Sequence, residues 1–225
     1  MGKVKRSLST NPNFTPLQSK IFSQAVLTPF ILKQFYFTGG TALSAFYLNH
    51  RRSEDLDFFS EVEFPEDGVL EFMDNLAQVL GLTPRFTNRE RTKIFEFVKS
   101  GNLLIKVDFA YYPHKRLELG NTYKGFNIDS IRDIATNKLL TINQRTEIKD
   151  YVDLYFLLKE FTLWDLIYAI ERKFRMEMDL ILIAADFLKV LDMDTMPEMI
   201  KPLMLDELKS FFREKAKELG RKSVE

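Results

Sequence analysis

The chain has 225 residues, in which 32 Lys and Arg balance 32 Asp and Glu, and 45% of the residues are apolar. This composition is typical of a soluble globular protein, and the chain is long enough for one large domain or two small ones. The 21 Phe predict an aromatic core. The absence of Cys excludes a thiol nucleophile, a disulfide framework and thiolate metal sites, and two His residues are too few for a multi-His metal site. Any bound metal should therefore be a hard cation with oxygen ligands.

The charges are distributed unevenly along the chain. Residues 1–53 contain seven Lys or Arg and no acid, whereas the rest of the chain carries 25 bases and 32 acids. A basic segment of this kind would suit a polyanionic ligand, although Lys3, Lys5 and Arg6 are equally well explained as a solvated tail. No apolar run has the ~18 residues of a membrane span, and no apolar stretch of a secretory signal follows the basic start. We therefore expect a cytoplasmic protein that does not enter a membrane.

The first half of the chain alternates between strand and helix patterns. A short aromatic run, 34–38, predicts a strand that stops at Gly39-Gly40, and apolar residues at helical spacing follow over 41–49. Later segments predict a strand at 55–59, an amphipathic helix over Glu66–Leu80 closed by Gly81, a third strand at 83–87, and a hairpin of 93–99 with 103–112.

The second half of the chain is predicted to be helical. Capping-box patterns at 130–133, 162–165 and 195–198 each indicate the start of a helix. Residues 179–191 are apolar nearly all round and predict the central buried helix, with the amphipathic stretch 203–219 packed outside it. We place the boundary between Pro113 and Ile128, which gives domains of residues 1–115 and 116–225.

A glycine motif stands where the first predicted strand gives way to a helix. The motif is Gly39-Gly40-Thr41, and a helix N-terminus offers free N–H groups and a positive dipole end to an anion such as phosphate. The glycines would let a phosphate approach the backbone, and Thr41 could cap the helix or donate its hydroxyl to that phosphate. The alternative is that the two glycines form only a tight turn.

Two aspartates, Asp55 and Asp57, flank one apolar residue on the next predicted strand. Both carboxylates should project from one face about 6 to 7 Å apart, where they could share a cation. Alternatively, Arg51 or Arg52 pairs with them and offsets their repulsion. A second Asp-x-Asp pattern, at 192–194, follows no glycine turn and is expected in a solvated loop.

A third carboxylate, Asp108, lies in the predicted hairpin. It shares a strand face with Lys106, opposite the apolar Ile105, Val107 and Phe109, so this polar pair either faces solvent or points into a site. If the hairpin strand lies beside the strand at 55–59, three carboxylates converge. Two Mg²⁺ ions need such a set to hold the attacking and leaving oxygens of a phosphoryl-type displacement.

Charged residues also gather in the helical half. Lys138 is expected on the helix after Ser130, and Asp150 and Asp153 share one face of the next helix because they are three residues apart. The two acids could simply interact with the positive end of that helix dipole. The functional alternative places Lys138 on a triphosphate and the two acids on the nucleotide or on Lys149.

Taken together, these segments resemble the AbiEii/AbiGii toxin family of the DNA polymerase beta-like nucleotidyltransferase superfamily. The resemblance lies in Gly39-Gly40-Thr41-Ala42-Leu43, in the run HRRSEDLDFF at 50–59, and in the thirteen residues that separate Thr41 from Asp55. It continues in Asp108 on a later strand and in Lys138, Arg145 and the run KDYVDL at 149–154. The matches extend from about residue 36 to residue 158.

The resemblance implies an α+β fold, with a nucleotidyltransferase-like mixed β-sheet core and flanking helices followed by a C-terminal helical bundle. It implies that Asp55, Asp57 and Asp108 are the catalytic residues and hold Mg²⁺, with two ions expected and Mn²⁺ able to replace them. The nucleotide-binding residues that it implies are Gly39, Gly40, Thr41, Arg51, Ser53, Lys138, Asp150 and Asp153.

The expected function is transfer of a nucleoside monophosphate from a nucleoside triphosphate to an acceptor hydroxyl, with release of pyrophosphate. RNA, in particular tRNA, is the expected acceptor, and the chain is expected to be the toxin of a toxin–antitoxin or abortive-infection system with a cognate antitoxin protein. One alternative is nucleotide transfer to a protein hydroxyl, as in AMPylation. Another is a catalytically silent nucleic-acid-binding module, supported by the basic N-terminal stretch but opposed by the three intact carboxylates.

Overall fold

A computed structural model describes residues 12–222, so the basic start at residues 1–6 lies outside the described residues. The described chain forms two compact units. A sheet unit comprises the chain up to Tyr47, Ser53–Lys115 and Leu119–Ser130, and a helical unit comprises Leu48–Arg52, Arg116–Glu118 and the chain from Ile131 onward. Of these segments, Leu48–Arg52 precedes residue 115 but belongs to the helical unit, and Leu119–Ser130 follows it but belongs to the sheet unit.

The sheet unit is built on a mixed five-stranded sheet of order β1-β2-β5-β4-β3. Strands β2 and β5 are parallel, and every other neighbouring pair is antiparallel. The predicted mixed sheet and the 93–112 hairpin are thereby confirmed. The strands are β1 (Tyr36–Thr38), β2 (Leu56–Ser60), β3 (Pro84–Arg89), β4 (Thr92–Lys99) and β5 (Asn102–Tyr111), and a separate ribbon pairs β6 (Thr122–Tyr123) with β7 (Phe126–Asn127).

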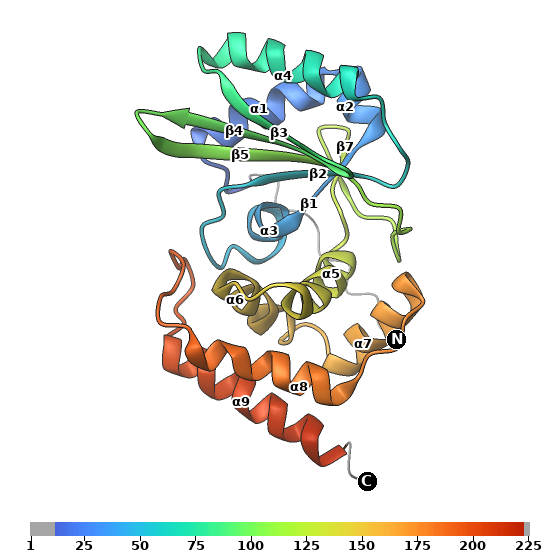
Figure 1. Ribbon diagram of the computed structural model, residues 1–225, viewed down its shortest axis with the longest axis vertical. Helices are drawn as coiled ribbons and strands as arrows, with labels where there is room; N and C mark the ends of the chain where they lie inside the picture. Colours follow the sequence, from blue (N-terminus) through green and yellow to red (C-terminus); the bar gives the residue numbers. More distant parts are fainter. Residues whose placement is uncertain (1–11, 223–225) are drawn as a thin grey trace. The chain divides into compact units, whose positions relative to one another are not determined.

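Helices flank both faces of this sheet. Figure 1 shows α1 (Pro16–Leu27), α2 (Pro29–Gln34) and α4 (Glu66–Leu80) on one side and the short α3 (Gly39–Ala42) on the other. Helix α4 has the predicted bounds and ends at Gly81 in the left-handed conformation. Helix α3 continues as a π-helical turn, Leu43–Leu48, within the predicted helical segment. Helix α1 was not predicted, although Thr15 and Gln18 form a complete capping box at its start.

The core of the sheet unit is aromatic, as the number of Phe residues predicted. Phe58 of β2 and Phe109 of β5 stack with their ring centroids 5.1 Å apart, and neither side chain is exposed. Phe72 of α4 contacts Phe109 edge-on, and Phe37 of β1 lies against Phe58. These contacts place α4 against the face of the sheet that carries the Phe side chains. Residues 57 and 108 alternate with them and must point to the opposite face.

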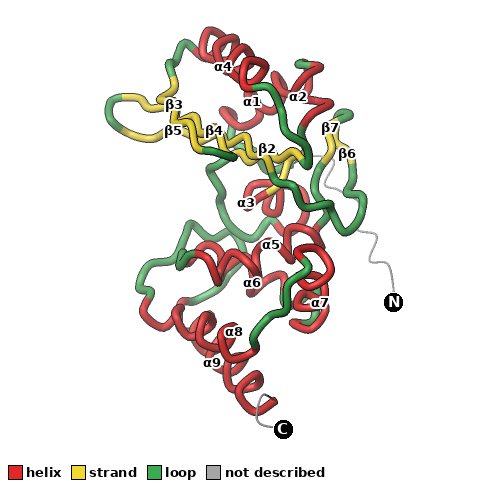
Figure 2. Tube along the Cα trace, turned by 45° about the vertical axis from the view of Figure 1, so that its right-hand side comes forward, coloured by secondary structure: helices red, strands yellow, loops and turns green. Residues whose placement is uncertain are grey.

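The helical unit contains five α-helices in the described part of the chain, and Figure 2 shows the loops that join them. Helix α7 begins with the predicted capping box of Thr162 and Asp165. Among the described residues, no helix combines the length and apolar character that a membrane span requires. The helices are α5 (Ile131–Gln144), α6 (Ile148–Leu157), α7 (Leu163–Phe174), α8 (Leu180–Leu188) and α9 (Leu205–Lys222).

Two predictions for the helical unit were wrong. No helix begins at 195–198, because the backbone there pairs with the segment 48–52: Arg52 N–H donates to the Glu198 carbonyl at 2.8 Å, and Ile200 N–H donates to the His50 carbonyl at 2.9 Å. Helix α8 is not the central buried helix, since Ile181 is 64% exposed. That position belongs to α6, in which every residue from 150 to 157 is buried.

Candidate functional site

Strand register brings Asp57 and Asp108 together. The two residues are direct partners in the parallel pairing of β2 with β5. Directly paired residues of neighbouring strands point to the same face of a sheet, with the strands about 4.8 Å apart. The neighbours Leu56 and Val107 are fully buried on the aromatic face, so Asp57 and Asp108 share the other face.

Asp55 joins these two carboxylates through a lysine. The Nζ atom of Lys106 lies 2.7 Å from Oδ2 of Asp108 and 3.9 Å from Oδ2 of Asp55. The two carboxylate oxygens are therefore no further apart than the sum of these distances. Asp55 itself stands immediately before β2 and not within it. The structure thus brings the three aspartates together, with the ammonium group of Lys106 among them.

The electrostatics of this acidic cluster follow from its buried groups. The carboxylates of Asp55, Asp57 and Asp108 all act on the ammonium group of Lys106. Burial raises the pKa of Asp108, and the charges of Asp55 and Glu96 add to the effect of burial, so the bond from Lys106 does not bring this pKa back down. Burial would lower the pKa of Lys106, but the hydrogen bond and the negative charge of Asp108 outweigh it and raise that pKa. Burial thus stabilises the proton on Asp108, and the neighbouring carboxylates stabilise the proton on Lys106.

The glycine motif holds the acidic residues in place. Gly39 has a φ of 77°, and a Cβ atom at this position would lie 2.0 Å from Oδ2 of Asp57. Only glycine lets the carboxylate of Asp57 approach the backbone this closely. The hydroxyl of Thr41, which is buried, donates a hydrogen bond to the backbone carbonyl of Asp55. Contacts of Gly39, Gly40 and Thr41 with phosphate stay predictions.

A glutamine that the sequence analysis missed fixes the loop before Asp55. The side-chain amide of Gln18 donates to the carbonyls of Ser53 at 2.7 Å and Glu54 at 3.2 Å. Gln18 is only 2% exposed, and its side-chain oxygen accepts from the N–H of Thr15 in the capping box of α1. The pattern T-x-x-Q at 15–18 was the available signal for this role. A direct contact of Ser53 with nucleotide stays a prediction.

In the helical unit, Asp153 is the centre of a buried ionic network. Its carboxylate is fully buried and accepts a hydrogen bond from Nε2 of His50 at 2.7 Å. It also accepts two hydrogen bonds from Arg51, at 2.7 and 2.8 Å, in a bidentate pair. Nζ of Lys138 lies 2.6 Å from the same carboxylate and 2.7 Å from Asp150. Arg51, which was an alternative partner for Asp55 or Asp57, thus has Asp153 as a partner in this structure.

The pKa shifts in this network match its hydrogen bonds. Burial would raise the pKa of Asp153, but Lys138 and Arg51 outweigh it and hold this pKa well below its usual range. Burial would likewise lower the pKa of Lys138, yet Asp153 and Asp150 raise it, so the ammonium stays charged. Burial lowers the pKa of His50 despite the nearby Asp153. His50 is therefore neutral near pH 7 with its proton on Nε2, and its buried Nδ1 has no hydrogen-bond partner among the described residues.

Asp150, which is itself fully buried, connects the network to Arg145, whose side chain is 47% exposed. It accepts bonds from Nε of Arg145 at 2.8 Å and from Lys138, and these cations lower its pKa although burial would raise it. The acids thus pair with Lys138, Arg51 and Arg145, while Lys149 contacts Glu147 at 3.0 Å. These contacts stabilise the helical unit. The predicted contacts of Arg51, Lys138, Asp150 and Asp153 with nucleotide stay predictions.

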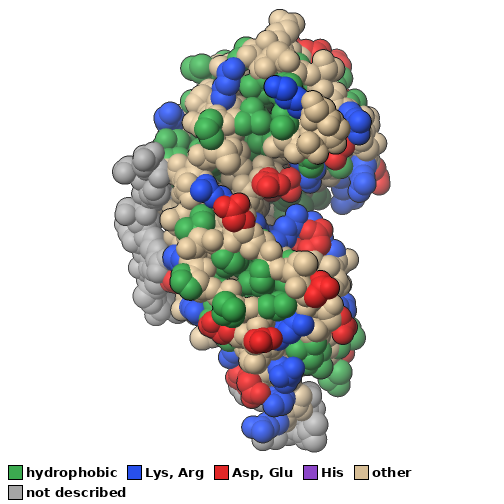
Figure 3. Space-filling model, turned by 90° about the vertical axis from the view of Figure 1, so that its left-hand side faces the viewer, with side chains coloured by type: hydrophobic (Ala, Val, Ile, Leu, Met, Phe, Trp, Pro, Cys, Tyr) green, Lys and Arg blue, Asp and Glu red, His purple; other side chains and the backbone are tan. Residues whose placement is uncertain are grey.

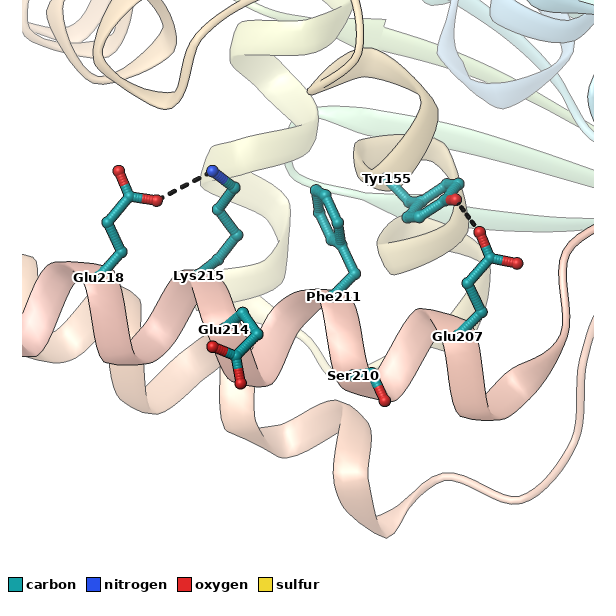
Figure 4. Close-up of a pocket in the computed structure, with 7 residues that line it drawn as sticks. All are labelled: Tyr155, Glu207, Ser210, Phe211, Glu214, Lys215 and Glu218. Atoms are coloured by element: carbon teal, nitrogen blue, oxygen red, sulfur yellow. Dashed lines mark hydrogen bonds and ion pairs between the residues drawn. The ribbon is translucent and has the colours of Figure 1, made fainter.

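A separate hollow of about 390 Å³ lies along α9 (Figure 4). Its lining includes Phe211 and Tyr155, whose hydroxyl donates a hydrogen bond to Glu207. None of the three aspartates of the acidic cluster lines it. On the face shown in Figure 3, basic side chains are interspersed with acidic ones and do not form a continuous patch.

The acidic cluster suits a divalent cation in its chemistry, although it does not form a finished metal site. Among residues 12–222, no three carboxylate or imidazole groups stand in a ready metal-binding arrangement. However, all its donors are the carboxylate oxygens that Mg²⁺ prefers. Oδ1 of Asp108 is buried without a hydrogen-bond partner, and the ammonium group of Lys106 already shows that a cation fits between Asp108 and Asp55. The residues therefore fit such an ion.

Two comparisons of the sequence with known proteins give matches over most of the chain. The sequence matches the family described as "Nucleotidyl transferase AbiEii toxin, Type IV TA system" over residues 23–223. It is 32% identical over 197 residues to an uncharacterized protein of Aquifex aeolicus (strain VF5), a match that covers 84% of this chain and 89% of that protein.

Solved structures share the fold at lower identity. JHP933 from Helicobacter pylori is 20% identical with a TM-score of 0.54, and the match covers 92% of this chain and 90% of that one. MenT4, a nucleotidyltransferase toxin from Mycobacterium tuberculosis H37Rv, is 14% identical with a TM-score of 0.50, and the match covers 91% and 84% of the two chains. The family match, over most of the chain, decides the assignment: this protein is a nucleotidyltransferase that belongs to the AbiEii toxin family.

Proposed function

We propose that this enzyme transfers a nucleoside monophosphate from a nucleoside triphosphate to an acceptor hydroxyl, and that it depends on Mg²⁺ held by Asp55, Asp57 and Asp108. The observation that carries the proposal is the register of Asp57 with Asp108 on one sheet face, where Lys106 links Asp108 to Asp55. Two ions are proposed, and Mn²⁺ should replace Mg²⁺ because both accept carboxylate oxygens.

In the proposed reaction the acceptor oxygen attacks the α-phosphorus of the triphosphate. The new bond joins that oxygen to the α-phosphorus, the bond to the oxygen bridging to the β-phosphate breaks, and pyrophosphate leaves with the bonding electrons. The proton of the acceptor hydroxyl goes to the carboxylate of Asp108. When bound, the metal ions neutralise charge on the phosphate oxygens. Asp55 and Asp57 are kept in place by Thr41 and Gly39 respectively.

The triphosphate is proposed to contact the backbone of the glycine motif. The N–H groups at the start of α3 follow β1 directly, and a helix N-terminus favours an anion. The remaining nucleotide-binding residues are proposed from the family resemblance. They are Arg51, Ser53, Lys138, Asp150 and Asp153, in addition to Gly39, Gly40 and Thr41.

We propose RNA, and tRNA in particular, as the acceptor, with the protein acting in the cytoplasm as a toxin that a cognate antitoxin protein controls. The support is the family itself and the excess of seven basic residues in the first 53. RNA binding through that segment should weaken steeply as salt rises. Transfer to a protein hydroxyl is the competing proposal, since the acidic cluster does not distinguish the two acceptors.

The test is to incubate the protein with each α-³²P-labelled triphosphate and total RNA or total protein, with and without Mg²⁺, and to locate the label. We expect Mg²⁺-dependent labelling of RNA that Asp57→Asn reduces by orders of magnitude. Asp194→Asn is the matched control, because Asp194 belongs to the second Asp-x-Asp pattern and is exposed. Labelled protein would favour the competing acceptor, and labelling that survives Asp57→Asn would overturn the site.

A further inference from the structure

We infer that Lys106 is the resident counter-ion of the acidic cluster, which the metal must displace, and that Glu96 receives the displaced ammonium group. The inference deepens the proposed function and rests on its metal site. It assigns to Lys106 a positioning role, because the side chain would control access of the cation to the three aspartates. Two observations carry it: the place of the Lys106 ammonium group and the register of Lys106 with Glu96.

The Lys106 ammonium group occupies a position that a metal ion would need. Its Nζ lies 2.7 Å from Oδ2 of Asp108 and 3.9 Å from Oδ2 of Asp55, and the negative charge of Asp57 also acts on it. A divalent cation that binds the same oxygens would stand within a few ångströms of this ammonium group, where like charges repel. The two cations therefore compete for one set of ligands.

Glu96 offers the displaced ammonium group a partner on the same sheet. Lys106 and Glu96 are direct partners in the antiparallel pairing of β5 with β4, so their side chains point to one face. None of the ion pairs among the described residues uses the carboxylate of Glu96. The long, flexible stem of a lysine can swing from one carboxylate to a cross-strand neighbour. Departure of Lys106 would also free Oδ2 of Asp108, beside an Oδ1 that already has no hydrogen-bond partner.

The experiment measures Mn²⁺ binding by the loss of the free-ion electron paramagnetic resonance signal, without nucleotide. We expect Lys106→Met to bind Mn²⁺ about tenfold more tightly than wild type, since the competing cation is gone. Lys106→Arg keeps the charge and should bind close to wild type. Lys93→Met is the matched control, because it removes a lysine of the neighbouring strand β4 that pairs at 2.8 Å with Glu66 of α4. It should leave the Kd for Mn²⁺ unchanged.

Glu96→Gln tests the second half of the inference. It should weaken Mn²⁺ binding several-fold in the wild-type background, because the displaced ammonium group loses its partner. In the Lys106→Met background the same substitution should have little effect, which separates a role through Lys106 from a general loss of negative charge. An equal effect of Glu96→Gln in both backgrounds would overturn the role of Glu96.

The melting temperature of Lys106→Met and the Mn²⁺ affinity of Asp57→Asn distinguish the remaining outcomes. If Lys106 only stabilises the sheet, Lys106→Met lowers the melting temperature in chelator but leaves the Kd for Mn²⁺ unchanged, and the inference fails. The proposed function survives that result as long as Asp57→Asn abolishes Mn²⁺ binding. If wild type does not bind Mn²⁺, or if Asp57→Asn binds it as tightly as wild type does, both the metal site and the inference are wrong. If Lys106→Met does not fold, Glu96→Gln decides, and an unchanged Kd for Mn²⁺ overturns the inference.

Discussion

Replacing Asp153 with Asn should destabilise the protein strongly, because this carboxylate is the centre of the buried network in the helical unit. It is fully buried and has nitrogen atoms of His50, Arg51 and Lys138 within 2.8 Å. Asparagine has nearly the same shape, so the substitution creates no cavity. It removes the negative charge, and its amide nitrogen, a donor, would face other donors. Two buried cations would then have lost their shared partner.

The expected loss is about 3 to 5 kcal/mol, the cost of removing one partner from a buried ion pair. For a chain of this size, 1 kcal/mol changes the melting temperature by about 2 to 4 °C. The melting temperature of Asp153→Asn should therefore fall by roughly 6 to 20 °C. The effect should appear without nucleotide or metal, since Asp153 takes part in the fold itself.

Differential scanning calorimetry at pH 7 provides the measurement. The matched control is Glu198→Gln, the same change of carboxylate to amide in a surface pair, where Arg52 Nε lies 3.5 Å from Glu198 and the Glu198 side chain is 76% exposed. It should change stability by less than about 1 kcal/mol. An Asp153→Asn protein that melts within about 2 °C of wild type would refute this account. If such a protein also lost its stabilisation by Mg²⁺ with triphosphate, the Asp153 carboxylate would act in the nucleotide site without stabilising the fold.

Three further predictions concern single residues. Gly39→Ala should lower the melting temperature and abolish label transfer. The Cβ atom of the alanine would collide with Asp57, and the φ of 77° is strained for alanine. A fully active variant would contradict this. Thr41→Val should cost about 1 kcal/mol in chemical denaturation and reduce transfer, since the bond to the Asp55 carbonyl is lost, whereas Thr41→Ser should retain both. His50 has a lowered pKa in the fold, so the unfolded chain takes up its proton first as pH falls. Wild type should therefore lose stability below about pH 6.5 relative to His50→Gln, by at most about 1.4 kcal/mol per pH unit. The melting temperatures of both proteins are measured from pH 8 to pH 5, and the same pH dependence in both would contradict this.

Alternation along single strands predicted the carboxylate face of the sheet. Ile105, Val107 and Phe109 are all buried, and this spacing alone puts Asp108 and Lys106 on the other face. What the sequence does not show is which strands become neighbours. The parallel pairing of β2 with β5 skips over β3 and β4, and only this pairing places Asp57 directly beside Asp108.

Partner choice among charged residues could not be predicted from their spacing. Arg51 and Arg52 are adjacent in sequence, yet Arg51 pairs with the buried Asp153 and Arg52 with the exposed Glu198. Both partners lie about a hundred residues or more along the chain, so local spacing carries no information about them. Helix α8 illustrates the same limit for burial, because an apolar composition predicted a buried helix, whereas Ile181 remains mostly exposed.

The glycine motif and the Asp-x-Asp pair form one structural unit, although their separate positions in the sequence predicted two independent motifs. The glycines were predicted to admit a phosphate, but a carboxylate already uses the space that Gly39 leaves open, since Asp57 lies where a Cβ atom would be. Thr41, two residues later, holds the backbone of Asp55. Each end of the motif therefore positions one member of the Asp-x-Asp pair. Both substitutions, Gly39→Ala and Thr41→Val, should consequently reduce Mn²⁺ binding as well as nucleotide transfer, which a purely phosphate-binding motif would not do.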